Sequence, residues 1–207
     1  MAVIDHLVIT VPDLAIGLDW FESAVGVRPA IGGSHPGMGT HNALASMGDS
    51  YIELIAPDPD QPDHDGPRPF GVSPDCEPGL VTFAVRPDQG ETIESIAAAM
   101  RSAGHDPGEV IGMSRTTTDG RTLQWRLTFP AMSANGFIPF LIDWGDTAHP
   151  SASAPGDIQL VEFGGSTAEN TAANRVLTAI GLGDLAVHGT GGLGALLTGP
   201  GQRTWSL

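Results

Sequence analysis

Residues 4–14 read Ile-Asp-His-Leu-Val-Ile-Thr-Val-Pro-Asp-Leu, and this stretch decides the fold. The run before the proline is rich in Val and Ile, which predicts a buried strand over residues 3–11. Pro12 breaks that strand, and Asp13 is a residue type that caps helix starts. Apolar residues then recur at helical spacing up to Gly26, which predicts a helix covering one face of the strand. His6 should lie on the opposite face, because side chains alternate along a strand.

Three more strands are predicted after this helix, over residues 27–31, 40–46 and 50–57. The glycine-rich segment 32–39 separates the first two and reads as a loop or a bulged strand. In the strand 40–46, His41 shares a face with two alanines. In the strand 50–57, Glu53 shares a face with Tyr51 and Ile55. The unit is therefore strand, helix and three strands.

The same order of elements begins twice more along the chain. A strand at 79–85, a helix at 91–103 and strands at 110–117, 122–129 and 138–144 follow the first unit. A strand at 158–163, a helix ending at Ile180 and short strands at 185–188, 193–198 and 203–207 come last. We therefore divide the chain into a first βαβββ unit (1–57), a linker (58–78), a second unit pairing with the first (79–148), a linker (149–156) and a shorter third unit (157–207). This pattern predicts an α+β fold of repeated βαβββ units, with curved mixed sheets around a cleft and helices outside.

Composition excludes several classes of function. The net charge of -15, with only 9 Lys and Arg, opposes binding to nucleic acids or anionic membranes. No stretch approaches the ~18 apolar residues of a membrane span. Cys76 is the single cysteine, so no intrachain disulfide forms, and no signal-peptide pattern is seen, so we expect a cytoplasmic protein. The phosphate-loop pattern GxxxxGK[ST] and the hydrolase pattern GxSxG do not occur.

Two histidines and one glutamate carry the strongest indication of chemistry. Glu53 stands within an apolar strand, where a carboxylate must be paired or ligated because burying it alone is costly. His6, His41 and Glu53 together could hold a divalent iron, zinc or manganese ion and leave positions open for a substrate. Glu53 is also the candidate catalytic carboxylate. Alternatively, Glu53 pairs with an arginine such as Arg126 or Arg28, and the histidines only satisfy local hydrogen bonds.

Five other residues are candidates for contacts with a substrate. His35 and Asn42 flank the end of the glycine-rich segment. Trp125 and Arg126 alternate on one strand, so an aromatic wall and a clamp for a carboxylate would face opposite ways. Asp143 could pair with Arg126, which would then be an ordinary surface charge.

Several runs of residues resemble one known superfamily. They are DHLV (5–8), PDL (12–14), GGSHPG (32–37), GTHNAL (39–44), YIEL (51–54), LTF (127–129) and PFLIDW (139–144). The chain resembles the glyoxalase-like branch of the vicinal oxygen chelate superfamily, which contains glyoxalase I, extradiol ring-cleaving dioxygenases and metal-free bleomycin-resistance proteins.

This resemblance implies a cleft with a metal on its floor, held by the first and last strands of two paired units. His6 and Glu53 occupy those places in the first unit. In the second unit, the position that corresponds to His6 is Leu80 or Val81, and the position that corresponds to Glu53 is Leu141. None of these side chains can bind a metal, so the resemblance implies the fold more strongly than the chemistry.

Two functions remain open. One is a metal-dependent lyase, isomerase or dioxygenase acting on a small oxygenated metabolite; the other is a metal-free protein that binds or sequesters a small molecule. A homodimer is also expected, because an unpaired third unit would expose sheet edges and an apolar face.

Overall fold

The first part of the computed structural model is a strand, a helix and three strands. They are β1 (Ala2–Thr10), α1 (Leu14–Val25), β2 (Ala30–His35), β3 (Thr40–Ser46) and β4 (Tyr51–Pro57). The Asp13 side chain accepts a hydrogen bond from the backbone N–H of Ile16, and Gly26 ends the helix with a φ of 87°. Both predicted caps of α1 are therefore present. The structure describes residues 1–116, 120, 122–129, 136–167, 170–185 and 191–207.

The second part repeats this plan. Its elements are β5 (Gly79–Pro87), α2 (Ile93–Ser102), β6 (Val110–Thr116), β7 (Thr122–Thr128) and β8 (Phe140–Asp143). Thr92 and Ser95 form a reciprocal capping box at the start of α2. The predicted mixed α+β fold of βαβββ units is thus confirmed.

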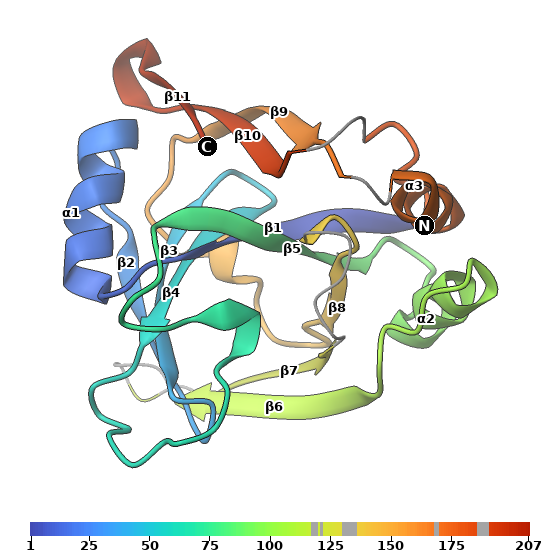
Figure 1. Ribbon diagram of the computed structural model, residues 1–207, viewed down its shortest axis with the longest axis horizontal. Helices are drawn as coiled ribbons and strands as arrows, with labels where there is room; N and C mark the ends of the chain where they lie inside the picture. The colour runs from blue at the N-terminus through green and yellow to red at the C-terminus, as the bar shows by residue number, and fades with distance from the viewer. Residues whose placement is uncertain (117–119, 121, 130–135, 168–169, 186–190) are drawn as a thin grey trace.

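These strands form one curved sheet in the order β2-β3-β4-β1-β5-β8-β7-β6 (Figure 1). β1 and β5 pair antiparallel at its centre, and each has a parallel neighbour from its own unit, β4 or β8. β2 and β6, at opposite ends of the order, come into contact with each other. The sheet therefore curls until its two ends meet, and it encloses a concave face.

The two faces of the sheet have different partners. Leu7 and Ile9 of β1 are fully buried in the core that also holds Phe21 of α1. His6 and Val8 point to the other, concave side, where Val8 joins a smaller apolar cluster. This is the alternation expected of a strand with a helix on one side only.

The third part of the chain packs on the helix side. β9 (Gln159–Gly165), α3 (Asn170–Ala179), β10 (Leu193–Thr198) and β11 (Thr204–Ser206) supply a separate sheet in the order β11-β10-β9. Trp205 lies edge-on to Trp20 and Phe21 of α1, with ring centroids 5.0 and 5.7 Å away. One face of the third part is therefore packed against α1, and the homodimer expected above stays a prediction. The strand expected at 185–188 lies largely outside the described residues.

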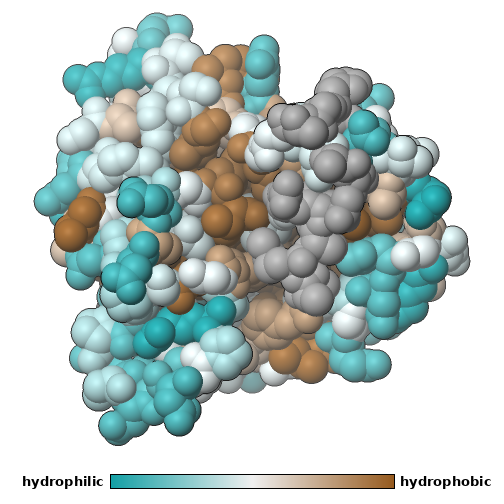
Figure 2. Space-filling model, in the orientation of Figure 1, coloured by the Kyte–Doolittle hydropathy of each residue, from teal (hydrophilic) through white to brown (hydrophobic). Residues whose placement is uncertain are grey.

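The described connecting segments include the short 3-10 helices η1 (Pro69–Gly71), η3 (Pro150–Ala152) and η4 (Pro200–Gln202). On the face shown in Figure 2, apolar side chains gather in the middle and hydrophilic ones surround them. Among the described residues, no helix is long and apolar enough to cross a membrane.

Candidate functional site

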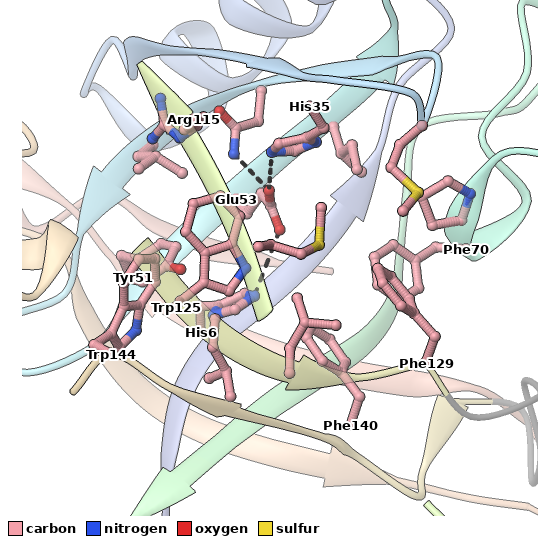
Figure 3. Close-up of a pocket in the computed structure, with 18 residues that line it drawn as sticks. His6, His35, Tyr51, Glu53, Phe70, Arg115, Trp125, Phe129, Phe140 and Trp144 are labelled. Atoms are coloured by element: carbon pink, nitrogen blue, oxygen red, sulfur yellow. Dashed lines mark hydrogen bonds and ion pairs between the residues drawn. The ribbon is translucent and has the colours of Figure 1, made fainter. Parts of the chain in front are cut away.

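The concave face of the curved sheet holds a cavity with one polar end. The space between its lining atoms, including the part open to solvent, is about 600 Å³. Both units of the sheet contribute to its wall, so it exists only because the sheet curls. Its polar end is built from His6, His35, Asn42, Glu53 and Arg115 (Figure 3). An apolar lining with a few polar groups gathered at one end is typical of sites for small organic molecules.

Glu53 is the centre of the polar end and lies between His6 and His35 in Figure 3. Its Oε2 is 3.5 Å from His6 Nε2, and its Oε1 is 3.9 Å from His35 Nε2. The Asn42 amide donates to Oε1 at 2.6 Å. Burial alone would raise the pKa of Glu53, but the interactions with His6, His35 and Asn42 outweigh it and lower that pKa to about 2. Glu53 is therefore an anion at neutral pH.

His6 is held from behind by a fully buried carboxylate. Its Nδ1 donates to Asp5 Oδ1 at 2.7 Å, which directs Nε2 toward Glu53. Burial would lower the pKa of His6, yet the contacts with Asp5 and Glu53 raise it to about 9. The Tyr51 ring stacks on the imidazole at 4.5 Å. His6 is therefore a buried cation between two anions.

Asp5 has partners from distant parts of the chain. His149, at the N-cap of η3, donates from Nε2 to Oδ2 at 3.0 Å, and Trp144 donates from Nε1 at 3.2 Å. Arg86 NH1 lies 3.6 Å from the same oxygen. Burial would raise the pKa of Asp5, but the hydrogen bonds from His149 and His6 hold it well below its usual range. The charge of Asp5 is thereby fixed, and with it the orientation of His6.

Arg115 brings a second cation to the polar end from the other half of the sheet. It lies on β6, is only 6% exposed, and donates from NH1 to the backbone oxygen of Gly32 on β2. Burial lowers the pKa of Arg115, and the charge of Glu53 opposes that shift. A Cβ at position 32 would overlap Asn42 Oδ1 on β3 and lie 3.2 Å from Arg115 NH2, so glycine leaves room for both side chains.

The rest of the wall is apolar, and most of it comes from the second unit. Phe70 of η1 adds a ring from the linker, 5.2 Å from the Phe140 ring. It adopts a φ of 58°, which is unusual for a residue with a side chain. The second-unit residues of this wall include Met113, Trp125, Leu127, Phe129, Phe140 and Ile142.

Gln61, in the linker, holds the glycine-rich segment 32–39 in place through hydrogen bonds. Gln61 Oε1 accepts from the Gly37 N–H at 2.8 Å. Its amide donates to Ser34 Oγ at 3.0 Å and to the His35 backbone oxygen at 3.1 Å. Arg68 Nε donates to the Gly39 backbone oxygen at 2.8 Å. The linker therefore positions the segment that carries His35.

Of the residues singled out from the sequence, His6, His35, Asn42, Glu53 and Trp125 line this cavity. The structure does not bring His41 to them. His41 pairs with Ser34 across β2 and shares its face of β3 with Ala43 and Ala45, which pack in the core with α1. The correction has a simple reason: those alanines are small because a helix approaches them, and Asn42 takes the position on the cavity side.

Arg126 and Asp143 also lie away from the cavity. Arg126 NH2 contacts Asp143, and NH1 contacts Glu94 at 2.5 Å. The Arg126 side chain is 46% exposed. Because Trp125 faces the cavity, its neighbour on the strand must face outward. The alternative stated above, a surface charge paired with Asp143, is the arrangement in the structure.

The last strand of the second unit is shifted by one residue from the expected correspondence. Leu141 packs in the core on the helix side, while Phe140 and Ile142 face the cavity. Neither of these two side chains can bind a metal, so β8 offers no counterpart of Glu53.

Several contributors were not singled out as site residues from the sequence. Tyr51 was foreseeable, because the predicted strand face carries it beside Glu53. Asp5 was foreseeable as a buried carboxylate next to His6. Arg115 and His149 reach the site through contacts with residues far away in the chain, and no local pattern indicates them.

The donor atoms of the site provide a test for a metal ion. His6 Nε2 and Glu53 Oε2 face each other, and a histidine whose other nitrogen is held by a carboxylate is typical of metal sites. In the part of the chain that the structure describes, however, no group of three or more His, Cys, Asp or Glu side chains could hold a metal. The described residues therefore do not fit an ion held by three protein ligands.

Comparison with known proteins gives three kinds of result. Residues 4–181 match the family model of a glyoxalase-like domain. None of the curated proteins compared with the chain matches it. Among solved structures, a hypothetical protein from Staphylococcus aureus has 16% identity and a TM-score of 0.62, with 100% of this chain and 85% of that chain covered.

Two other solved structures are methylmalonyl-CoA epimerases. The one from Mycobacterium tuberculosis has 19% identity and a TM-score of 0.39, covering 67% of this chain and 84% of that one. The one from Streptomyces coelicolor, in complex with 2-nitronate-propionyl-CoA, has 17% identity and a TM-score of 0.43, covering 72% and 98%. At these identities a structural likeness bears on the fold alone, and the two epimerase scores are too low to bear on function.

Proposed function

Since this chain belongs to the glyoxalase-like domain family, as its sequence predicted, we propose that it is an enzyme that moves a proton on a small oxygen-bearing molecule. The observation that carries the proposal is a chain of contacts from Asp5 through His6 to Glu53, which ends at the polar end of the cavity. A proton donor and a proton acceptor face the same enclosed space there, as general acid–base catalysis requires.

The two groups act together on a carbonyl compound. Glu53 accepts a proton from the carbon next to the carbonyl, and His6 gives its Nε2 proton to the carbonyl oxygen, so that a neutral enol forms. Return of the two protons yields the substrate or its isomer. In the empty cavity Glu53 is a weak base, because the cationic His6 lowers its pKa to about 2. Loss of the His6 proton removes that cation, so the basicity of Glu53 rises during the step.

The mechanism uses no metal ion, because no three described His, Cys, Asp or Glu side chains could hold one. A divalent ion at His6 and Glu53 would polarise a substrate oxygen if a further ligand came from the substrate or from solvent. Zinc and manganese titrations, followed by the thermal midpoint of the wild type and of Glu53→Gln, test that arrangement directly. A midpoint that rises only in the wild type would support the metal.

The apolar wall favours a second candidate function, binding of a small molecule without chemistry. The described cavity residues of the second unit are mainly aromatic and aliphatic, which is sufficient for sequestration.

Deuterium uptake separates the two candidates. The protein is incubated in D2O with a panel of 2-oxo acids and 2-hydroxy ketones, and carbon-bound deuterium is measured by mass spectrometry. Glu53→Gln should abolish uptake, and Asp143→Asn, which alters a carboxylate outside the cavity, should keep it. Binding of panel members without uptake would favour sequestration, and uptake that survives in Glu53→Gln would remove Glu53 from the reaction.

A further inference from the structure

Arg115 is a buried cation without a carboxylate partner in the part of the chain that the structure describes. Ion pairs join four other arginines to carboxylates, whereas no described carboxylate forms one with Arg115. Its NH1 donates a hydrogen bond to the Gly32 backbone oxygen, which is uncharged. Burial of a charged group is costly unless an opposite charge neutralises it.

The other charges near the polar end balance one another. His6 and Glu53 form a pair at 3.5 Å. Asp5, fully buried behind His6, is balanced in turn by Arg86, whose NH1 lies 3.6 Å from its Oδ2. Arg115 therefore leaves an excess of positive charge at this end, in a chain whose net charge is -15. An anion inside the cavity would be the missing partner.

The character of that anion follows from its surroundings. A guanidinium has five N–H donors in a planar fork that matches a carboxylate. Glu53 lies in the same end of the cavity and would repel a dianion such as a phosphate monoester. The remaining wall, including Trp125, Phe129 and Phe140, offers apolar surface for a ring or a branched chain.

We propose that the cavity takes a monocarboxylate with an apolar, ring-sized body, and that Arg115 is the residue that selects its carboxylate. The apolar body lies against the aromatic wall, and the remaining polar atoms of the ligand face His6 and Glu53. This assignment rests on the proposed function only in naming which end of the ligand reacts; the binding itself is independent of it.

Two ligands of the same shape test the charge. Calorimetric titration at pH 7 compares 3-phenylpropanoate with 3-phenylpropanamide, its neutral counterpart. The wild type should bind the acid at least about tenfold more tightly than the amide, because only the acid pairs with the buried cation. Propanoate, which lacks the ring, and phenyl phosphate, a dianion, should both bind more weakly than 3-phenylpropanoate.

Two arginine variants test whether Arg115 is the residue that causes the preference for the acid over the amide. Arg115→Met should abolish the preference for the acid, whereas Arg126→Met, which alters an exposed arginine of the same sheet, should retain it. Circular dichroism shows whether Arg115→Met is folded; if it is not, the comparison of acid with amide in the wild type still decides.

Equal binding of acid and amide, tighter binding of phenyl phosphate, or no binding of the acid at millimolar concentration would each overturn the assignment. These outcomes are distinct from a failure of the proton-transfer function. Preferential binding of the acid without deuterium uptake would refute that function alone. Uptake with neutral ketones but no preference for the acid would refute the assignment of Arg115 alone.

Discussion

The guanidinium of Arg115 donates a hydrogen bond to the backbone oxygen of Gly32. The first residue lies on β6 and the second on β2, the strands at opposite ends of the eight-stranded order. One side chain thus joins the two βαβββ units where the sheet closes, and the same side chain contributes to the cavity wall. Closure of the sheet and the charge of the site are therefore linked.

Replacing Gly32 with alanine should damage this closure. The new Cβ would overlap Asn42 Oδ1 and approach the Arg115 guanidinium. We expect a loss of about 1–3 kcal/mol in the free energy of unfolding, as for other overpacked sites. Gly112→Ala is the matched control, because a Cβ there meets no atom within 4 Å. Urea unfolding of both variants gives the comparison, and equal stabilities would contradict the close packing of Asn42 and Arg115 around Gly32.

The pH dependence of stability should report the buried pair. His6 has a pKa of about 9 in the fold against its ordinary value of 6.5, so its contribution is complete below pH 6.5 and is lost as pH rises through 9. Glu53 has a folded pKa of about 2 against 4.5, so its contribution is complete above pH 4.5 and is lost as pH falls toward 2. The alkaline loss should be on the order of 3 kcal/mol. Urea midpoints measured from pH 6 to 10 should fall in the wild type and change less in His6→Gln.

Asp5→Asn should lower the pKa of His6 and destabilise the fold. The variant removes the anion that His6 and His149 contact, at a site with no exposure. Breaking a buried pair of this kind costs roughly 3–5 kcal/mol. Asp143→Asn, which breaks an exposed pair with Arg126, should cost roughly 1 kcal/mol or less. NMR titration of the His6 ring decides the first point, and an unchanged titration would show that Asp5 does not hold its charge.

Gln61→Ala should release the glycine-rich segment. The glutamine makes contacts with Ser34, His35 and Gly37 that an alanine cannot make. We expect a loss of about 1–2 kcal/mol and faster proteolysis between residues 32 and 39. Gln89→Ala, at an exposed turn after β5, is the control, and the protease should cleave this variant at the wild-type rate. Cleavage at the same rate in both variants would argue against a role for the linker in ordering the segment.

The first unit was the most predictable part of the fold. The helix caps at Asp13 and Gly26, and the face shared by Tyr51 and Glu53, follow from local rules that the structure obeys. His41 was the exception, because small neighbours on a strand fit two situations equally well, an open cleft or a helix close by. Periodicity identifies the two faces of a strand but does not say which partner each one has.

No local sequence pattern indicates the roles of Arg115 and His149. The first acts across the meeting of two strands at the ends of the sheet, and the second joins a linker to Asp5 at the start of the chain. Both contacts depend on how the whole sheet curls. A linker of Pro, Ser and Ala predicts a solvated histidine, yet the side chain of His149 is only 22% exposed.

The packing of Trp205, on β11, against α1 affects the synthesis of the protein in the cell. Trp20 and Phe21 leave the ribosome early, but their partner follows only after nearly all of the described chain has been synthesised. Until then, a nascent chain with both βαβββ units complete still presents apolar surface around α1. Exposed surface of this kind favours aggregation and recruits chaperones. Truncation before β9 should therefore impair yield and solubility before it affects the cavity, which lies on the other side of the sheet.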